Sequence, residues 1–489
     1  MQKLLSLCKK MYFWIFLAIL VFIPLYPKFP LVNVPLTYVA IRLEDVLIAL
    51  GFSMAVLIQL PRAKRLFKMA IIQSYALYWF IGLVSLTSAI FITYTVSPHL
   101  GFLHWLRRVE YMSLFFMAIT AISNLKQMKI TLVTFLAVTV VICIYGFGQQ
   151  WLGFPVVSTT NREFSKGQIL SLTPEARVNS TFAGHYDLAV YLSMVLAILS
   201  SMFFYFRIKD DKSWQLKNLI PEVTIVITGL LSFGLLGLTA ARVSFVATIL
   251  AIIASFWFNK KKLLIVIFIF LSIATVATIP ELRHRLVATL TVNLLGGGGA
   301  KYTPETGGEL DPGKRLTIEE RKSIFDAATM SGALDPNYEA TIASDLAPGE
   351  PINTTELGVY RSFKIRTDVE WPRAYRAFWR NPFLGTGYSS LGIATDNDML
   401  RLLGEVGILG ALSFGLIFVI VFKKLWQQYK SKNRLSRYFA VGMLAMVAGF
   451  LLNSLFIDVF EASKVATLFW ALLGMNWRLG SLGEKENNG

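Results

Sequence analysis

The charged side chains that could do chemistry stand at or near the ends of long apolar segments. They are Arg42, Glu44, Asp45, Arg107, Arg108, Glu110, Asp187, Arg242, Asp396, Asp398, Glu405, Asp458, Glu461 and Lys464. Ionisable residues close to membrane depth are costly and usually face a polar interior. We therefore expect these residues to line one polar cavity.

Arg242 differs from the other cations because it lies in a very short turn between two apolar segments, with no carboxylate nearby in the sequence. An isolated cation in such a turn suits an external anion. Guanidinium groups bind phosphate oxygens bidentately and keep their charge. Arg242 and Arg177 are therefore candidates for binding a diphosphate, with a solvated loop arginine as the alternative interpretation of Arg177.

Asp396 and Glu405 are the candidate catalytic carboxylates. A carboxylate beside arginines stays ionised and can accept a proton from an attacking hydroxyl group. Each has a structural alternative. Asp396, in the sequence Asp-Asn-Asp before an apolar segment, also fits a helix N-cap. Glu405, followed by Gly407 and Gly410, also fits a helix-packing contact.

Four further residues are possible supporting members of the site: Asn397, Arg107, Arg108 and Asp187. The i,i+3 spacing of Arg107 and Glu110, or of Arg42 and Asp45, would equally give structural ion pairs. The histidines lack metal-ligand spacing, and the sequence contains no Walker loop and no HExxH motif. No metal and no cofactor are predicted.

The elements that carry these residues are predicted to be membrane helices. The 489-residue chain is 55% hydrophobic and only 16% charged, whereas soluble domains have roughly 25% charged residues. A membrane helix needs roughly 20 apolar residues and satisfies its own backbone groups. We predict an all-α polytopic membrane protein with about twelve transmembrane helices. They span residues 12–26, 45–60, 69–93, 105–122, 130–150, 186–206, 221–238, 243–258, 263–279, 399–422, 438–456 and 463–477.

The formal net charge of +17 reflects topology rather than nucleic-acid binding, because the basic residues sit in short loops. Alternate loops, near residues 62–68, 126–129, 207–217, 260–262 and 423–437, carry them. Lys and Arg in short loops resist translocation. Both termini are therefore predicted to be cytoplasmic, and the charged residues of the site to face outward.

Two long segments, 151–185 and 280–398, then fall on the outer side. The predicted division is residues 1–279 with the first nine helices, 280–398 as a helical extracytoplasmic subdomain, and 399–489 with the last three helices and a cytoplasmic tail. Within the second unit, Thr317 and Glu320 fit a capping box, and residues 368–380 fit an amphipathic helix that ends before Asn381-Pro382.

Three segments resemble the O-antigen ligase and polymerase family of bacterial envelope enzymes. They are RVNSTFAGHYDLAVYL (177–192), LTAARVSFVA (238–247) and NPFLGTGYSSLGIATDNDMLRLLGEVGILG (381–410). They are similar to the family's arginine before Ser-Thr-Phe, its Thr-x-Ser-Arg turn, and its Asn-Pro, Gly-x-Gly and Glu-x-Gly pattern. Asp396 stands where the ligases carry histidine, which favours a polymerase or a related transferase.

The resemblance implies a GT-C-like fold and a metal-independent glycosyltransferase of the bacterial cytoplasmic (inner) membrane. The implied donor is an undecaprenyl-diphosphate-linked oligosaccharide, and the implied acceptor is a sugar hydroxyl of a glycan or lipid-glycan. Arg177 and Arg242 would stabilise the departing diphosphate, and Asp396 or Glu405 would accept the proton. Membrane lipids are the remaining expected partners.

Two other functions fit parts of the sequence. A SEDS-type peptidoglycan polymerase also uses lipid-linked sugars, but its usual topology lacks so long a loop before the last three helices. A flippase or transporter of lipid-linked oligosaccharide should carry broken helices in two halves and polar residues at mid-membrane. Here the charged residues gather on one side, which favours chemistry at the membrane surface.

Overall fold

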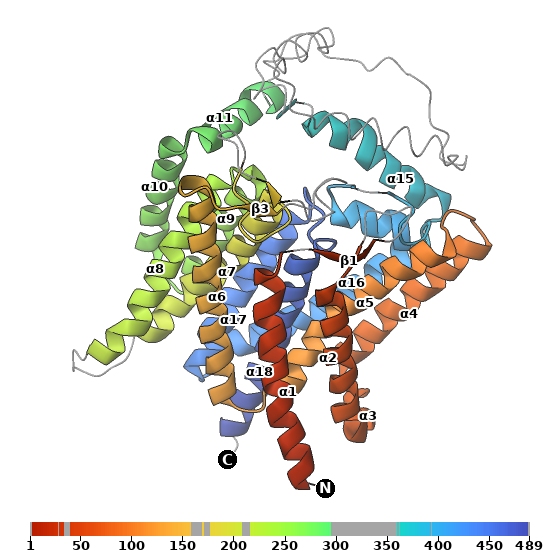
Figure 1. Ribbon diagram of the computed structural model, residues 1–489, viewed down its shortest axis with the longest axis horizontal. Helices are drawn as coiled ribbons and strands as arrows, with labels where there is room; N and C mark the ends of the chain where they lie inside the picture. Colours follow the sequence, from red (N-terminus) through yellow and green to blue (C-terminus); the bar gives the residue numbers. More distant parts are fainter. Residues whose placement is uncertain are drawn as a thin grey trace.

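The computed structural model describes residues 2–27, 29–33, 40–157, 169–170, 177–207, 216–294, 359–360, 362–392 and 394–487. These residues form a bundle of long apolar helices with two short strand pairs at one end (Figure 1). The all-α polytopic class predicted from composition is therefore confirmed. Most of segment 280–398, including the predicted capping box of Thr317 and Glu320, lies outside the described residues.

The long helices match the twelve predicted ranges to within a few residues at most ends. They are α1 (Gln2–Leu25), α2 (Leu43–Gln59), α4 (Ala70–Phe91), α5 (Pro98–Ala121), α6 (Leu125–Trp151), α7 (His185–Arg207), α8 (Leu216–Leu238), α9 (Arg242–Phe258), α10 (Lys262–Thr278), α16 (Asp398–Tyr429), α17 (Arg434–Asn453) and α18 (Ser463–Asn487). Apolar segments of this length form helices because only a helix satisfies every backbone group within the segment.

The shorter elements connect these helices. They are β1 (Pro30–Asn33), β2 (Ala40–Arg42), η1 (Leu60–Arg62), α3 (Ala63–Leu66), β3 (Val156–Val157), β4 (Ile169–Leu170), α11 (Pro280–Ala288), η3 (Thr289–Leu294), η4 (Ile365–Glu370) and α15 (Trp371–Arg380). Strands β1 and β2 pair antiparallel, as do β3 and β4. The predicted amphipathic helix at 368–380 corresponds to η4 and α15, which end at Arg380 as expected.

Eight helical segments of the described chain are long and apolar enough to cross a membrane, namely α1, α2 with its continuation through η1 and α3 (Leu43–Leu66), α4, α6, α7, α8, α16 and α17. Helices α10 and α11 are bent by 98° and together would make a ninth span, while α9 is apolar but has only 17 residues. Helices α5 and α18 are long enough but fall outside this set. The structure therefore supports a multi-pass membrane protein.

The two ends of the bundle differ. Both chain termini and α3 lie at one end, whereas α11 and α15 lie across the opposite end (Figure 1). We name the latter the α11/α15 end. Strands β1 and β3 lie toward it as well. The loop before α5 also belongs to it, because Arg380 of α15 donates a hydrogen bond to the Thr93 carbonyl.

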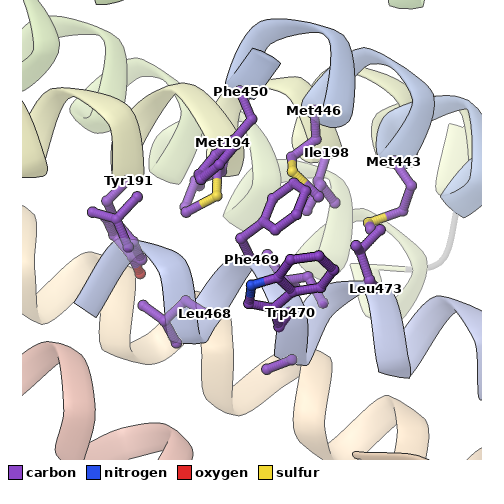
Figure 2. Packing of buried hydrophobic residues seen from close by; sticks show 14 of the residues in the cluster. Tyr191, Met194, Ile198, Met443, Met446, Phe450, Leu468, Phe469, Trp470 and Leu473 are labelled. Atoms are coloured by element: carbon purple, nitrogen blue, oxygen red, sulfur yellow. The ribbon is translucent and has the colours of Figure 1, made fainter. Parts of the chain in front are cut away.

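The centre of the core lies between α7, α17 and α18, whose side chains interdigitate in Figure 2. Phe450 of α17 stacks on Phe469 of α18, with ring centroids 4.1 Å apart. Within the most apolar stretch of α7, 83% of residues are buried, against 22% for α2. A helix buried on all sides is held rigidly, so α7 is a firm support for the residues at its first turn.

Helix α16 is broken at Gly407, where the backbone is non-helical (φ 70°, ψ −171°). The loop that follows α15 fills the break. The Ile408 amide donates to the Pro382 carbonyl at 2.8 Å, and the Thr386 and Gly387 amides donate to carbonyls of the preceding turn of α16 at 2.9 and 2.8 Å. Backbone groups released by a break in a membrane helix need such partners. The break therefore fastens the loop that leads to Asp396.

The Gly407 position leads to a stability prediction. A Cβ atom there would meet the Phe383 carbonyl group at 2.4 Å, and the positive φ disfavours any side chain. Gly407→Ala is expected to destabilise the fold by about 2 kcal/mol or more, measured as a lower thermal unfolding midpoint in detergent. Gly415→Ala in the same helix is the matched control, because its Cβ would meet nothing within 4 Å. Equal midpoints for the two variants would contradict this account of the break.

Candidate functional site

Four arginines gather at the α11/α15 end, and we name them the arginine cluster: Arg177, Arg242, Arg285 and Arg366. They come from the segment before α7, the first turn of α9, α11 and η4. Their charges interact with one another and with Tyr186 in the first turn of α7. The structure thus brings together Arg177 and Arg242, the two arginines expected to bind a diphosphate, and adds Arg285 and Arg366, which sequence reasoning missed.

Neutral side chains hold two members of the cluster. Arg177 Nη1 lies 2.5 Å from His185 Nε2, and its guanidinium lies over the Tyr186 ring, 5.7 Å from the centroid. Arg242 donates a hydrogen bond to the Thr289 hydroxyl of η3. Within the described ranges, no carboxylate forms an ion pair with Arg177, Arg242 or Arg285. Like charges this close repel one another, so the cluster suits a multivalent anion.

Arg366 links the cluster to Asp396. Its Nη2 lies 2.5 Å from Asp396 Oδ2, and the Asp396 side chain is 28% exposed. Burial raises the pKa of the Asp396 carboxyl, and the Arg366 charge opposes that shift. The backbone at Asp396 is left-handed (φ 49°), a conformation that aspartate and asparagine tolerate better than most residues.

Asn397, not Asp396, caps α16. Its side-chain oxygen accepts hydrogen bonds from the Met399 and Leu400 amides, both at 3.0 Å. This geometry is that of an N-cap. The cap role proposed as an alternative for Asp396 therefore belongs to its neighbour. Asp396 projects its carboxylate toward Arg366 and so toward the arginine cluster.

A buried ionic network lies behind Asp396, centred on Arg401, which is 1% exposed. Arg401 contacts Asp458 at 2.9 Å, and Glu405 and Glu461 each at 3.7 Å. Asp458 also accepts hydrogen bonds from the Thr395 amide at 2.8 Å and the Asn397 amide at 3.2 Å. These amides flank Asp396, so Asp458 positions it. Removal of one member of such a network leaves a buried charge without a partner and destabilises the fold.

Glu405 sits on the inner side of this network. It is 2% exposed, its Oε1 lies 3.7 Å from Arg401 Nη1, and it accepts a hydrogen bond from the Ser389 amide at 3.2 Å. These contacts place Glu405 among structural partners. Asp396 is consequently the better situated of the two candidate catalytic carboxylates to meet a substrate.

The predicted supporting residues divide into different regions. Arg108 pairs with Glu461 and donates to the Phe460 carbonyl at 2.9 Å, so it belongs to the buried network. Arg107 lies 3.9 Å from Asp45 of α2 and donates to the Ala40 carbonyl, which ties α5 to α2 and β2. Asp187 lies in the first turn of α7.

Lys464 secures the segment that carries Arg177. It is fully buried at the start of α18, and its ammonium group donates to the Thr181 carbonyl at 2.6 Å and the Pro24 carbonyl at 3.2 Å. Its Nζ also lies 5.2 Å from the centroid of the Phe182 ring, close enough for a cation–π interaction. Three separate parts of the chain are thereby fixed beside the arginine cluster.

Comparison of the sequence with known protein families and with curated proteins finds no relative. No family model matches the chain, and no curated protein matches it. In the part of the chain that the structure describes, no group of three or more His, Cys, Asp or Glu side chains is placed to hold a metal ion. The site is therefore characterised by its own residues: an arginine cluster joined through Arg366 to the half-buried carboxylate of Asp396.

Proposed function

We propose that this protein is a membrane glycosyltransferase that transfers or polymerises glycan from an undecaprenyl-diphosphate-linked donor to a sugar hydroxyl, as O-antigen polymerases and ligases do. The reaction would take place at the outer face of the bacterial cytoplasmic membrane. The observation that carries this proposal is the arginine cluster with a carboxylate at its edge, 2.5 Å from Arg366. The cluster suits a diphosphate, and the carboxylate suits an attacking hydroxyl.

In the proposed reaction, the arginine cluster holds the diphosphate of the donor. Asp396 accepts the proton of the acceptor hydroxyl as its oxygen bonds to the anomeric carbon of the donor sugar. The bond between that carbon and the phosphate oxygen breaks, and undecaprenyl diphosphate leaves with the electron pair. Arg177 and Arg242 stabilise the developing negative charge, so the guanidinium groups supply what a divalent cation supplies elsewhere.

The proposal includes a GT-C-like arrangement in which all twelve long helices cross the membrane. Helices α5 and α18 carry charged residues that lower their hydropathy, yet Arg107 and Lys464 have partners inside the bundle. Arg107 of α5 contacts Asp45, and Lys464 of α18 contacts backbone carbonyls. Charged residues in membrane helices are tolerated in such settings. Twelve crossings would leave both termini in the cytoplasm.

The topology can be tested at the two ends of α5. Ser97 and Ser123 flank this helix and are both exposed. In a variant lacking Cys8 and Cys143, the two native cysteines, Ser97→Cys is expected to react with an impermeant maleimide in intact cells. Ser123→Cys should react only after the membrane is permeabilised, because the basic loops keep its side cytoplasmic. Labelling of both positions in intact cells would show that α5 does not cross.

The function itself can be tested by deletion and reconstitution. Cells lacking the gene are expected to accumulate short lipid-linked glycans, detected by mass spectrometry of the lipid extract. The purified protein should then elongate or transfer that extracted glycan in nanodiscs. Accumulation without any transfer by the purified protein would indicate a flippase instead. Accumulation of lipid-linked peptidoglycan precursor alone would indicate a SEDS-type polymerase.

A further inference from the structure

Segment η4 and helix α15 carry several buried polar atoms that have no hydrogen-bond partner among the described residues. These atoms are Arg366 Nε, Glu370 Oε2, Trp371 Nε1 and Arg373 Nε. The hydroxyl group of Thr395, in the segment that precedes α16, is also buried and also lacks a hydrogen-bond partner within the described chain. Residues 394–396 contact η4 and α15, because Arg366 pairs with Asp396 and Arg373 donates a hydrogen bond to the Ala394 carbonyl. The unpartnered atoms therefore gather in one place beside Asp396.

Such a group of atoms indicates a ligand. Buried polar atoms in proteins almost always have partners, because an unpartnered one loses its water without compensation. Thr395 is fully buried, whereas Arg366, Glu370, Trp371 and Arg373 are each only partly buried. Rotation of these partly exposed side chains would present the unpartnered atoms to a molecule at the α11/α15 end.

The chemistry of the atoms narrows the kind of ligand. The arginine and tryptophan nitrogens only donate hydrogen bonds, whereas the Glu370 carboxylate accepts them when it is ionised. A phosphate group would satisfy the donors but would repel Glu370 and Asp396. A cation would be repelled by Arg366 and Arg373. A neutral molecule with several hydroxyl groups satisfies both kinds of atom, since every hydroxyl both donates and accepts.

Two further features suit a sugar. Trp371 lies beside Phe456, with ring centroids 6.2 Å apart, and offers an apolar surface next to the polar atoms. Burial, followed by the charge of Asp396, raises the pKa of Glu370 to about 7, and Arg366 and Arg373 oppose this shift while Asp458 adds to it. Near neutral pH the Glu370 carboxyl can therefore either donate to or accept from a hydroxyl group.

We propose that Glu370, Trp371 and Arg373 form a subsite that binds a neutral sugar of the acceptor glycan and holds its hydroxyl group beside Asp396. This inference rests on the function proposed above and specifies where the acceptor lies. The donor diphosphate occupies the arginine cluster, the acceptor sugar occupies the η4–α15 subsite, and Arg366 lies between the two.

The experiment separates acceptor binding from donor binding. The probe is the free glycan released by mild acid from the lipid-linked pool of cells lacking the gene, titrated into the full-length protein in nanodiscs. Trp371→Phe keeps the aromatic ring and removes one donor, and Glu370→Gln removes the carboxylate at constant shape. Each is expected to weaken glycan binding about three- to tenfold, as loss of one hydrogen bond does. Both should leave affinity for undecaprenyl diphosphate unchanged.

Tyr375→Phe, on the exposed part of α15, is the matched control and should bind the glycan as the wild type does. Unchanged glycan affinity in both test variants of a protein that still transfers glycan would overturn the subsite alone. Competition by inorganic pyrophosphate, strengthened in Glu370→Gln, would make it an anion site and also overturn the proposal. A wild-type protein that neither binds the free glycan nor transfers lipid-linked glycan would overturn the proposed function as well.

Discussion

Arg242→Ala is expected to lower glycan transfer by about 10² to 10³-fold, the usual loss when one preorganised donor to a developing negative charge is removed. Arg242 opens α9 and is held by the Thr289 hydroxyl, so its guanidinium is oriented before a substrate arrives. The variant should still fold, because removing one of several mutually repelling cations relieves electrostatic strain. The measurement is the initial rate of transfer by purified protein in nanodiscs, with the unfolding midpoint recorded beside it.

Two control variants make the prediction about Arg242 specific. Arg242→Lys keeps the charge and loses the two-pronged geometry, so it should recover only a small part of the activity. Arg283→Ala removes an exposed arginine of α11 whose side chain, among the residues that the structure describes, hydrogen-bonds only the Ala277 carbonyl. This variant should transfer glycan at the wild-type rate. Full activity in Arg242→Ala, or an equal loss in Arg283→Ala, would remove the diphosphate clamp from the mechanism.

The helices were predictable from the sequence because few backbone conformations are stable within a lipid bilayer. An apolar segment of about 20 residues has to satisfy its backbone internally, and each such segment is a helix in the structure. Hydropathy could not reveal the break at Gly407, because the segment stays apolar through it. The break depends on carbonyl and amide groups of the loop after α15, which only the three-dimensional fold brings into contact.

The candidate site was predictable only in part. Arg242 stood out because it is isolated in a short turn, and Arg177 was a candidate through guanidinium chemistry and the resemblance of the surrounding motif. Arg285 and Arg366 carry no such signal, since each lies in a polar segment where arginine is common. The contact between Arg366 and Asp396 joins residues that are distant along the chain. The same holds for Asp458, which fixes the backbone on either side of Asp396.

The buried network also shows what charge alone does not reveal about the role of a residue. Arg107 and Arg108 are adjacent and look equivalent, but successive residues of a helix point in different directions. Arg107 reaches Asp45 on α2, whereas Arg108 reaches Glu461 before α18. Glu405 likewise resembles a catalytic carboxylate in the sequence and lies against Arg401 in the structure. Burial and partners, which determine a carboxylate's role, are long-range properties.

Asp396→Asn is expected to lower the rate of glycan transfer by about 10² to 10⁴-fold, the usual loss when a general base is removed. Asparagine tolerates the left-handed backbone at this position. The cap of α16 is provided by Asn397, so the helix start is preserved. The donor should bind at least as well, because Arg366 loses its carboxylate partner and becomes available to the diphosphate. The affinity for undecaprenyl diphosphate and the unfolding midpoint are the accompanying measurements.

The pH dependence of transfer distinguishes a proton acceptor from a structural carboxylate at Asp396. A base works only when deprotonated, so the wild-type rate should fall as the pH drops through the pKa of Asp396, which burial raises above the usual aspartate value. Asp396→Asn should lose this acidic limb, while a variant that is merely unstable would keep it. If Asp396→Asn transfers glycan within a few-fold of the wild type, Asp396 only positions Arg366. The proton would then have to go to Glu370, whose carboxyl lies partly buried beside the same arginine.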